Sequence, residues 1–318
     1  MALLTVKNLS VGYHTRKGLL KSVQGVSFAL DPGKSLGLVG ESGCGKTTIG
    51  MALMGLLPDN ATVTDGEILF EGQDLLKMSK KEIQQVRWKK IAMIFQAAMN
   101  ALNPVHRVGE QISEAILAHD ADISEKAAMK QVENLFDLVG IPLDRMKDYP
   151  HHYSGGMKQR AIIAMALACH PSLIIADEPT TALDVIVQDQ ILSAIKDFQN
   201  KLKISVIFIS HDIAVVADIC DNIGIMFAGQ LVECGRIEEV FDAPMHPYTQ
   251  SLLASYLTLD KDVVQPDSYL CKPPDLINPT PGCRFCERCA VAEATCSLRA
   301  PEWVDISPTH KALCYQCK

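Results

Sequence analysis

A glycine-rich run that ends in a lysine and two threonines lies near the N-terminus, at residues 40–48. Two glycines enclose four residues, and a lysine and a hydroxyl residue follow directly, which is the pattern of a phosphate-binding loop. An apolar run precedes it, and a helical pattern follows it. Glycines let backbone N–H groups turn toward phosphates, and the next helix adds its positive end. We therefore expect ATP phosphates to contact Gly40, Ser42, Gly43, Cys44, Gly45, Lys46, Thr47 and Thr48.

Two residues of this run have individual roles in the prediction. Lys46 would hold the β- and γ-phosphates, and the hydroxyl of Thr47 would coordinate Mg²⁺. The alternative is a chance glycine-rich turn. The order of strand, loop and helix around the run argues against that alternative.

Two acidic residues follow a second apolar run, Leu173–Ala176. Parallel sheets bind ligands at the carboxyl ends of their strands, so Asp177 is placed to reach the metal. Glu178 is the candidate base that accepts a proton from, or orients, the water attacking the γ-phosphate. Taken alone, the pair would be read as solvated turn residues.

These residues need a scaffold, and the first 230 residues indicate an α/β sheet. Amphipathic helical patterns at Val132–Val139 and Val187–Phe198 alternate with short apolar runs, as in parallel sheets. The first of these helices is predicted to be capped by Ser124 and ended by Gly140. The segment from about 97 to 160 has no strand pattern and is interpreted as a helical insertion. The predicted buried strands are Ser35–Val39, Ile91–Phe95, Leu173–Ala176, Ser205–Ile209 and Ile223–Phe227.

Composition argues against several functions. The net charge of −7 and the pI near 5.7 give no basic surface for nucleic acid. The apolar runs are shorter than the roughly 20 residues of a membrane-spanning helix, and the start does not resemble a secretory signal. We therefore expect a cytoplasmic protein that reaches the membrane through partners. Its eleven cysteines are expected to be reduced, as metal ligands or buried apolar residues.

Five further segments resemble the ABC ATPases, and they occur in that family's order over about 230 residues. Singly, a Gln or His after a strand is more often structural than catalytic. The matching segments are Tyr13 (adenine contact), Gln96 (Q-loop), Tyr153–Arg160 (signature motif), Thr181–Asp184 (D-loop) and His211 (switch histidine).

The resemblance implies a P-loop NTPase fold with nucleotide held between two subunits arranged head to tail. It adds Gln96 as a metal ligand and catalytic residue, His211 as a catalytic residue and Asp184 as a nucleotide-binding residue. Ser154, Gly155 and Gly156 precede a helix expected near Met157, so they form a second phosphate-binding corner. One subunit has no use for two such corners on one nucleotide, which predicts ATP-dependent dimerisation.

Within the family, the chain resembles ATPase subunits of dipeptide, oligopeptide and nickel importers. Met157 favours the first of the two nonidentical ATPases in such importers. The implied partners are a paralogous ATPase, two permeases and, indirectly, an extracytoplasmic binding protein, with the chain peripheral on the cytoplasmic face of the membrane. The segments carrying this resemblance are Gly37–Gly43, Ala101–Val105, Tyr149–His151, Ser154–Arg160, His246–Thr249 and Pro281–Phe285.

The C-terminal region contains seven of the cysteines. We predict an ATPase domain at 1–243 and a cysteine-rich extension at 244–318. The Pro-containing segments around Pro244–Pro247 and Pro266–Pro281 are interpreted as a linker that leads to the cysteines. The family resemblance implies a [4Fe–4S] cluster on four thiolates with five, six and seventeen residues between them: Cys283, Cys289, Cys296 and Cys314. A zinc site is the alternative, from Cys286, Cys289, Cys314 and Cys317. Unliganded thiols in a disordered tail are the third interpretation.

Two other functions stay open at this stage. One is a soluble ABC ATPase acting on the ribosome or DNA, although the chain has neither a second cassette nor a long coiled-coil insertion. The other is a metal- or redox-sensing ATPase whose C-terminal region controls ATP use.

Overall fold

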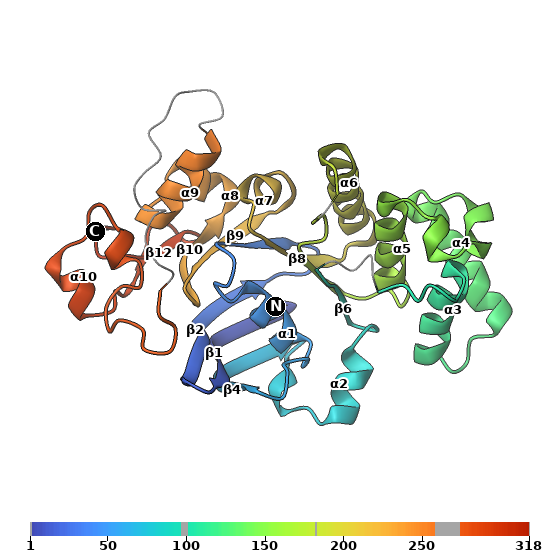
Figure 1. The fold of residues 1–318 in the computed structure, drawn as a ribbon, viewed down its shortest axis with the longest axis horizontal. Coiled ribbons are helices and arrows are strands. Elements are labelled where there is room, and N and C mark those ends of the chain that lie inside the picture. Colours follow the sequence, from blue (N-terminus) through green and yellow to red (C-terminus); the bar gives the residue numbers. More distant parts are fainter. Residues whose placement is uncertain (1, 97–100, 182, 258–273, 318) are drawn as a thin grey trace. The chain divides into compact units, whose positions relative to one another are not determined.

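The computed structural model describes residues 2–96, 101–181, 183–257 and 274–317 (Figure 1). The chain divides into two compact units. The first contains residues 1–30, 35–76 and 208–318, and the second contains 31–34 and 77–207. Strand β8 (Ser205–Ser210) runs through the point at which the chain passes from the second unit into the first.

The first unit carries an antiparallel sheet that the sequence analysis did not foresee. It consists of β1 (Leu4–Thr15), β2 (Gly18–Leu30), β4 (Ala61–Phe70) and β5 (Gln73–Asp74), in the order β2-β1-β4-β5. Irregular register along β1 interrupts its apolar alternation, because the pairing with β2 shifts between Val6 and Val11. The simple two-residue period that announces a strand is therefore absent.

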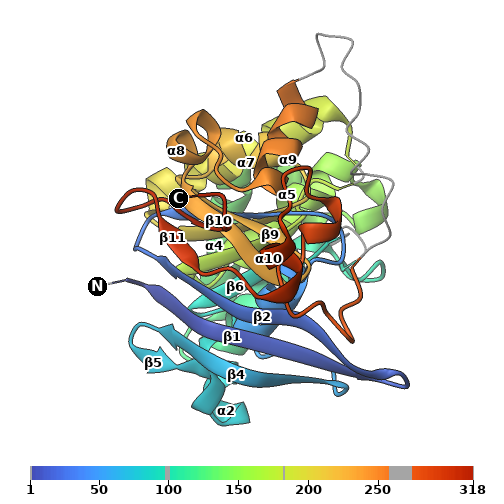
Figure 2. The same ribbon diagram turned by 90° about the vertical axis from the view of Figure 1, so that its left-hand side faces the viewer.

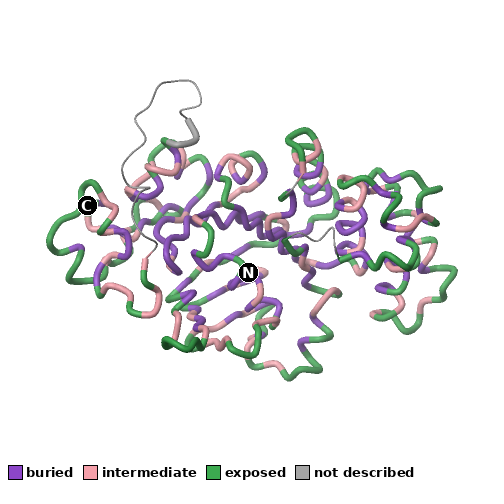
Figure 3. The backbone as a smooth tube through the Cα atoms, viewed as in Figure 1, coloured by how far each residue is buried: buried purple, intermediate pink, exposed green. Residues whose placement is uncertain are grey.

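The same unit contains strands of a second sheet, in the order β11-β12-β10-β9-β3. β3 (Ser35–Val39) pairs in parallel with β9 (Asn222–Phe227), and β10 (Gln230–Arg236) lies antiparallel to β9. Every residue of β3 is buried, as expected for a strand covered on both faces. Its neighbour β9 is likewise mostly buried (Figure 3). The helices of the unit are α1 (Lys46–Leu53), α7 (Ile213–Ile219), α8 (Ile237–Asp242) and α9 (Pro247–Leu257).

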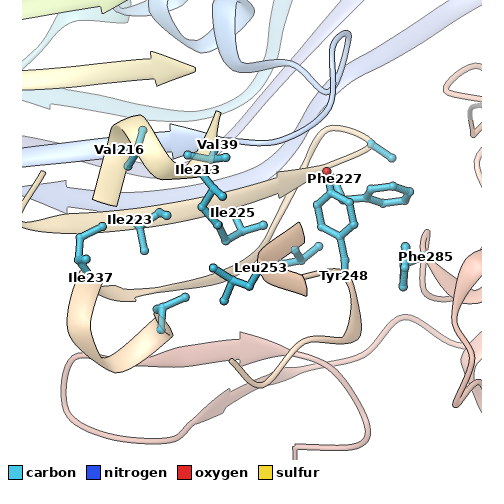
Figure 4. Close-up of a cluster of buried hydrophobic side chains, with 13 residues drawn as sticks. Val39, Ile213, Val216, Ile223, Ile225, Phe227, Ile237, Tyr248, Leu253 and Phe285 are labelled. Atoms are coloured by element: carbon cyan, nitrogen blue, oxygen red, sulfur yellow. The ribbon is translucent and has the colours of Figure 1, made fainter. Parts of the chain in front are cut away.

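A buried apolar cluster joins these elements to the C-terminal extension (Figure 4). Val39, Val216 and Ile225 come from the sheet and α7, and Leu253 comes from α9. Phe285 of the extension packs against the same cluster. The extension therefore shares the hydrophobic core of the first unit.

The second unit holds the helical insertion and the two predicted strands that precede and follow it. β6 (Ile91–Ile94) and β7 (Leu173–Asp177) pair in parallel. Between them lie α3 (Val108–His119), α4 (Glu125–Val139) and α5 (Gly155–Leu167), and α2 (Lys80–Val86) and α6 (Val185–Leu202) flank the two strands in sequence. Ser124 caps α4 and Gly140 ends it in the left-handed conformation, as the pattern predicted.

The extension contains α10 (Ala294–Leu298), β11 (Trp303–Asp305) and β12 (Lys311–Leu313). β12 pairs with β10, so the end of the chain adds strands to a sheet of the first unit (Figure 2). The prediction of a linker around Pro244–Pro247 is wrong, because Pro247 begins α9 and the residues beside it are buried. The part of the predicted linker from Pro266 to 273 lies outside the described residues.

In the ranges that the structure describes, no helix is both long and apolar enough to cross a membrane.

Candidate nucleotide site and cysteine cavity

The phosphate loop joins β3 to α1 in the first unit. Lys46 is 6% exposed, and its Nζ donates hydrogen bonds to the carbonyl oxygens of Gly40 at 2.6 Å and Glu41 at 3.0 Å. Gly45 has a φ of 104°, and a Cβ there would lie 2.4 Å from the carbonyl oxygen of Ser22. Only glycine suits this position. The loop is thus held with Lys46 inside its curve and with Ser42 and Gly43 exposed.

Thr47 and Thr48 lie in the first turn of α1 and differ in burial. Thr47 is exposed, whereas Thr48 is buried. The hydroxyl of Thr48 lies 3.2 Å from the hydroxyl of Tyr13 and 3.0 Å from that of Ser22. Tyr13, the predicted adenine contact, is therefore linked by its hydroxyl to the helix that follows the phosphate loop.

In the second unit, Asp177 ends β7 and Glu178 follows it directly. Asp177 is 1% exposed, and Glu178 has a φ of 45°, an uncommon conformation for a residue with a side chain. Glu178 Oε2 accepts hydrogen bonds from Gln96 Nε2 at 2.9 Å and Thr181 Oγ1 at 3.0 Å. The structure thus brings the Q-loop glutamine and the candidate base together.

The signature segment forms the start of α5. Ser154 is the N-cap, and its hydroxyl accepts a hydrogen bond from the N–H of Met157 at 3.3 Å. The helix begins at Gly155, two residues earlier than expected. A Cβ on Gly156 would lie 2.8 Å from Val187 Cγ1, and Asp184 caps that neighbouring helix by accepting from the N–H of Val187 at 2.9 Å. Ser154 and Gly155 remain exposed.

The predicted site residues thus divide between the units. The first unit holds Tyr13, the phosphate loop and His211, which is exposed one residue before the N-cap of α7. The second unit holds Gln96, the acidic pair, the signature corner and Asp184. Ala182 of the predicted D-loop lies outside the described residues.

Two residues that the sequence analysis did not assign to the site hold the phosphate loop from outside. The hydroxyl of Tyr248 accepts a hydrogen bond from the N–H of Glu41 at 3.1 Å. Arg288 donates to both carboxylate oxygens of Glu41, at 2.9 and 2.6 Å. Tyr248 lies in a segment matched to the importer group, and Arg288 lies between two cysteines. Neither sequence pattern predicts that the residue contacts the phosphate loop.

The cysteines of the extension converge on one cavity. Burial raises the pKa of the Cys283 thiol to about 11, and the neighbouring cysteines add to the rise. Cys317 does not line the cavity, and its Sγ lies 3.6 Å from the carbonyl oxygen of Met245. Cys271 lies outside the described residues. The cavity lining includes Cys283, Cys286, Cys289, Cys296, Cys314 and His246.

The described part of the chain contains no set of three or more His, Cys, Asp or Glu side chains already arranged to hold a metal ion. The cavity therefore gathers thiols without showing a closed ligand set. Four cysteine thiolates are the donor set of a [4Fe–4S] cluster, so the residues present fit that group by type and number.

Comparison with known proteins identifies the family of the chain. The ABC transporter family model matches residues 23–181, and the model of the oligopeptide/dipeptide transporter C-terminal region matches 232–296. The dipeptide transport ATP-binding protein DppD of Bacillus subtilis is 47% identical over 98% of this chain and 94% of its own. The oligopeptide transport ATP-binding protein OppD of Escherichia coli is 41% identical, over 99% and 93%.

Among solved structures, cbiO1 from Clostridium perfringens, part of the ABC transporter complex cbiONQ, is 27% identical with a TM-score of 0.67. The match covers 81% of this chain and 95% of that one. It supports the fold of a P-loop ABC ATPase. The chain belongs to the ABC transporter family, as an ATP-hydrolysing subunit that carries the oligopeptide/dipeptide-type C-terminal region.

Proposed function

We propose that this chain powers the import of dipeptides or oligopeptides by hydrolysing ATP. One observation supports the proposal most directly: a single chain combines a phosphate loop with a C-terminal region of the oligopeptide/dipeptide type. Relatives named for dipeptide and oligopeptide transport match nearly the whole length of this chain. A role on the ribosome or DNA finds no support in these relatives.

Each residue of the proposed ATP site has its own role. Lys46 and the loop amides bind the β- and γ-phosphates, and Thr47, Gln96 and Asp177 bind Mg²⁺. Glu178 activates the attacking water, and His211 contacts the γ-phosphate. The support for Glu178 is its placement by Gln96, which orients one carboxylate oxygen at 2.9 Å.

The chain pairs with a paralogous ATPase subunit, so that ATP is held between the two subunits. Ser154, Gly155 and Gly156 present a helix N-terminus with exposed positions, which suits the phosphates of a nucleotide held by the facing subunit. Asp184 lies beside this corner through Val187. Closure around ATP then drives two permease subunits, and the chain sits at the membrane through them.

The test is reconstitution with the co-encoded permeases, partner ATPase and binding protein. We expect ATP hydrolysis to rise when the binding protein is loaded with a peptide, and not when it is offered Ni²⁺. Stimulation by Ni²⁺ alone, or by no solute, would contradict peptide import. The variant Lys46→Ala, which removes the phosphate contact, is the control without turnover.

We also propose that the extension holds a [4Fe–4S] cluster on Cys283, Cys289, Cys296 and Cys314. All four line the cavity, whereas the zinc alternative needs Cys317, which does not. The cluster would supply folding free energy to a segment with few apolar residues. Anaerobic purification should give four irons and four sulfides per chain with visible absorption, and Cys296→Ser should lose both. One zinc per chain, or no metal, would contradict it.

A further inference from the structure

The C-terminal extension reaches the phosphate loop through one short turn. Residues Cys286–Arg288 form a 3-10 turn, and the guanidinium of Arg288 meets the carboxylate of Glu41, the second residue of the loop. The two hydrogen bonds measure 2.9 and 2.6 Å and engage one carboxylate oxygen each. This is the two-point geometry in which arginine binds a carboxylate most strongly.

The surroundings of this pair exclude water from the arginine. The side chain of Arg288 is 8% exposed and that of Glu41 is 35% exposed. The guanidinium lies 5.3 Å from the ring centre of Phe227 and 5.7 Å from that of Phe285. An ion pair in this setting is screened less than a surface pair. The ion pair between Arg288 and Glu41 therefore restrains the phosphate loop.

Glu41 is also held through its backbone. Its N–H donates to the hydroxyl of Tyr248, and its carbonyl oxygen accepts from Lys46. Tyr248 lies against Phe227 and Phe285 (Figure 4), the rings that flank Arg288. The extension and α9 thus determine the position of a residue that contacts the phosphate-binding lysine.

A second series of hydrogen bonds connects the extension to Cys44 of the phosphate loop. Arg284 donates to the carbonyl oxygen of Ala228 and to the side-chain oxygen of Gln24. Gly229, which follows Ala228 in the chain, donates its N–H to the carbonyl oxygen of Cys44 in the phosphate loop at 3.0 Å. Two arginines of the extension therefore support the loop, one directly and one through the turn after β9.

We infer that Arg288 is a positioning residue for ATP binding: through Glu41 it holds the phosphate loop in the conformation that accepts the triphosphate. Without Arg288, the Glu41 carboxylate is left unpaired beside the position of the phosphates, and the loop loses its outer restraint. Both effects weaken binding of Mg-ATP. The chemical step, which Glu178 is proposed to serve, is not altered.

The test uses the full chain and equilibrium binding of a fluorescent ATP analogue with Mg²⁺. We expect Arg288→Met and Glu41→Gln each to weaken binding about tenfold, and the double variant to be no weaker than either single one. Arg288→Lys, which keeps the charge without the two-point geometry, should lie between. In the reconstituted transporter the KM for ATP should rise while kcat at saturating ATP changes less than twofold.

The matched control is Arg299→Met in the same extension. Arg299 pairs with Glu302 at 3.5 Å, and both side chains are more than three-quarters exposed (79% and 86%). It should leave ATP binding within twofold of the wild type. Glu41→Gln decides the question if Arg288→Met unfolds the extension, because it alters the loop side alone. Binding within twofold for Glu41→Gln, or additive weakening in the double variant, would overturn the inference.

Discussion

Gln96 donates a hydrogen bond from its side-chain amide to the Glu178 carboxylate, across 2.9 Å. The bond fixes one oxygen of the candidate base. Glu178→Gln removes the charge that accepts a proton from water while keeping the shape of the side chain. We expect hydrolysis to fall by at least about 100-fold and ATP to stay bound, trapping the closed dimer. Single-turnover hydrolysis and size-exclusion chromatography with the partner subunit measure both.

The matched variant for this prediction is Thr181→Val, which removes the hydroxyl that donates to Glu178 Oε2 and leaves the carboxylate in place. Its hydrolysis should fall far less, by about tenfold or less. Full hydrolysis in Glu178→Gln would remove Glu178 from the proposed role.

Ser154→Asp separates phosphate binding from helix stability. Aspartate caps a helix as well as serine does and is favoured at its N-terminus, so α5 should stay folded. Its negative charge, however, repels a phosphate at the same corner. ATP-dependent association with the partner subunit should be lost, as seen by light scattering. Ser124→Asp, the same change at the N-cap of α4, is the control that should associate normally. Normal association of the Ser154 variant would argue against the second corner.

Tyr153, immediately before the signature serine, serves stability. It is 5% exposed, and its hydroxyl donates to the carbonyl oxygen of Arg145 at 2.8 Å. Burial raises its pKa, so the hydroxyl keeps its proton at ordinary pH. Tyr153→Phe should lower the free energy of unfolding by about 1 to 2 kcal/mol, measured in urea, with ATP binding unchanged. Tyr149→Phe, at a half-buried ring stacked on His151, should cost less. An equal loss in both would contradict a specific role of the Tyr153 hydroxyl.

Glu233 anchors the end of the chain. Its buried carboxylate accepts from the N–H groups of Met245 and His246, both at 2.8 Å, and from Nε2 of His310 at 2.7 Å. His310→Ala leaves this carboxylate without its side-chain partner, which should cost about 3 kcal/mol and expose the β11–β12 hairpin to protease. Lys311→Ala, at a half-exposed ion pair with Asp305, is the control. Unchanged proteolysis of the His310 variant would contradict the anchor.

His246 makes the protein sensitive to acid. Burial lowers its pKa from 6.5 to about 4, so the folded protein keeps it neutral where the unfolded chain takes up a proton. Stability should therefore fall as the pH decreases from 6.5 toward 4 and should not depend on this residue above that range. Asn in its place can still accept the N–H of Tyr248, a bond of 3.0 Å in the structure, and does not titrate.

The measurement is urea unfolding of the wild type and His246→Asn between pH 7.5 and 4.5. The stability of the variant relative to the wild type should improve by about 1 to 2 kcal/mol on going from pH 7 to pH 5. His151→Asn, at an exposed histidine, is the control substitution. A constant difference at all pH values would disprove the role of His246.

The features encoded in short runs of sequence could be predicted. The phosphate loop needs only its glycines, Lys46 and the flanking strand and helix, and these are consecutive in the chain. The buried strands and the Ser124 and Gly140 ends of α4 were predicted for the same reason, since burial pattern and capping depend on near neighbours. The extents of the domains and the individual site roles stay predictions.

Contacts between distant segments were decided by the tertiary structure alone. Arg288 and Glu41 are 247 residues apart, and the sequence around either residue does not indicate that the two are in contact. Spacing likewise left two cysteine sets open, and only the folded extension places five thiols around one cavity and Cys317 outside it. Local propensity acts over a few residues, whereas such pairings depend on which surfaces the core brings together.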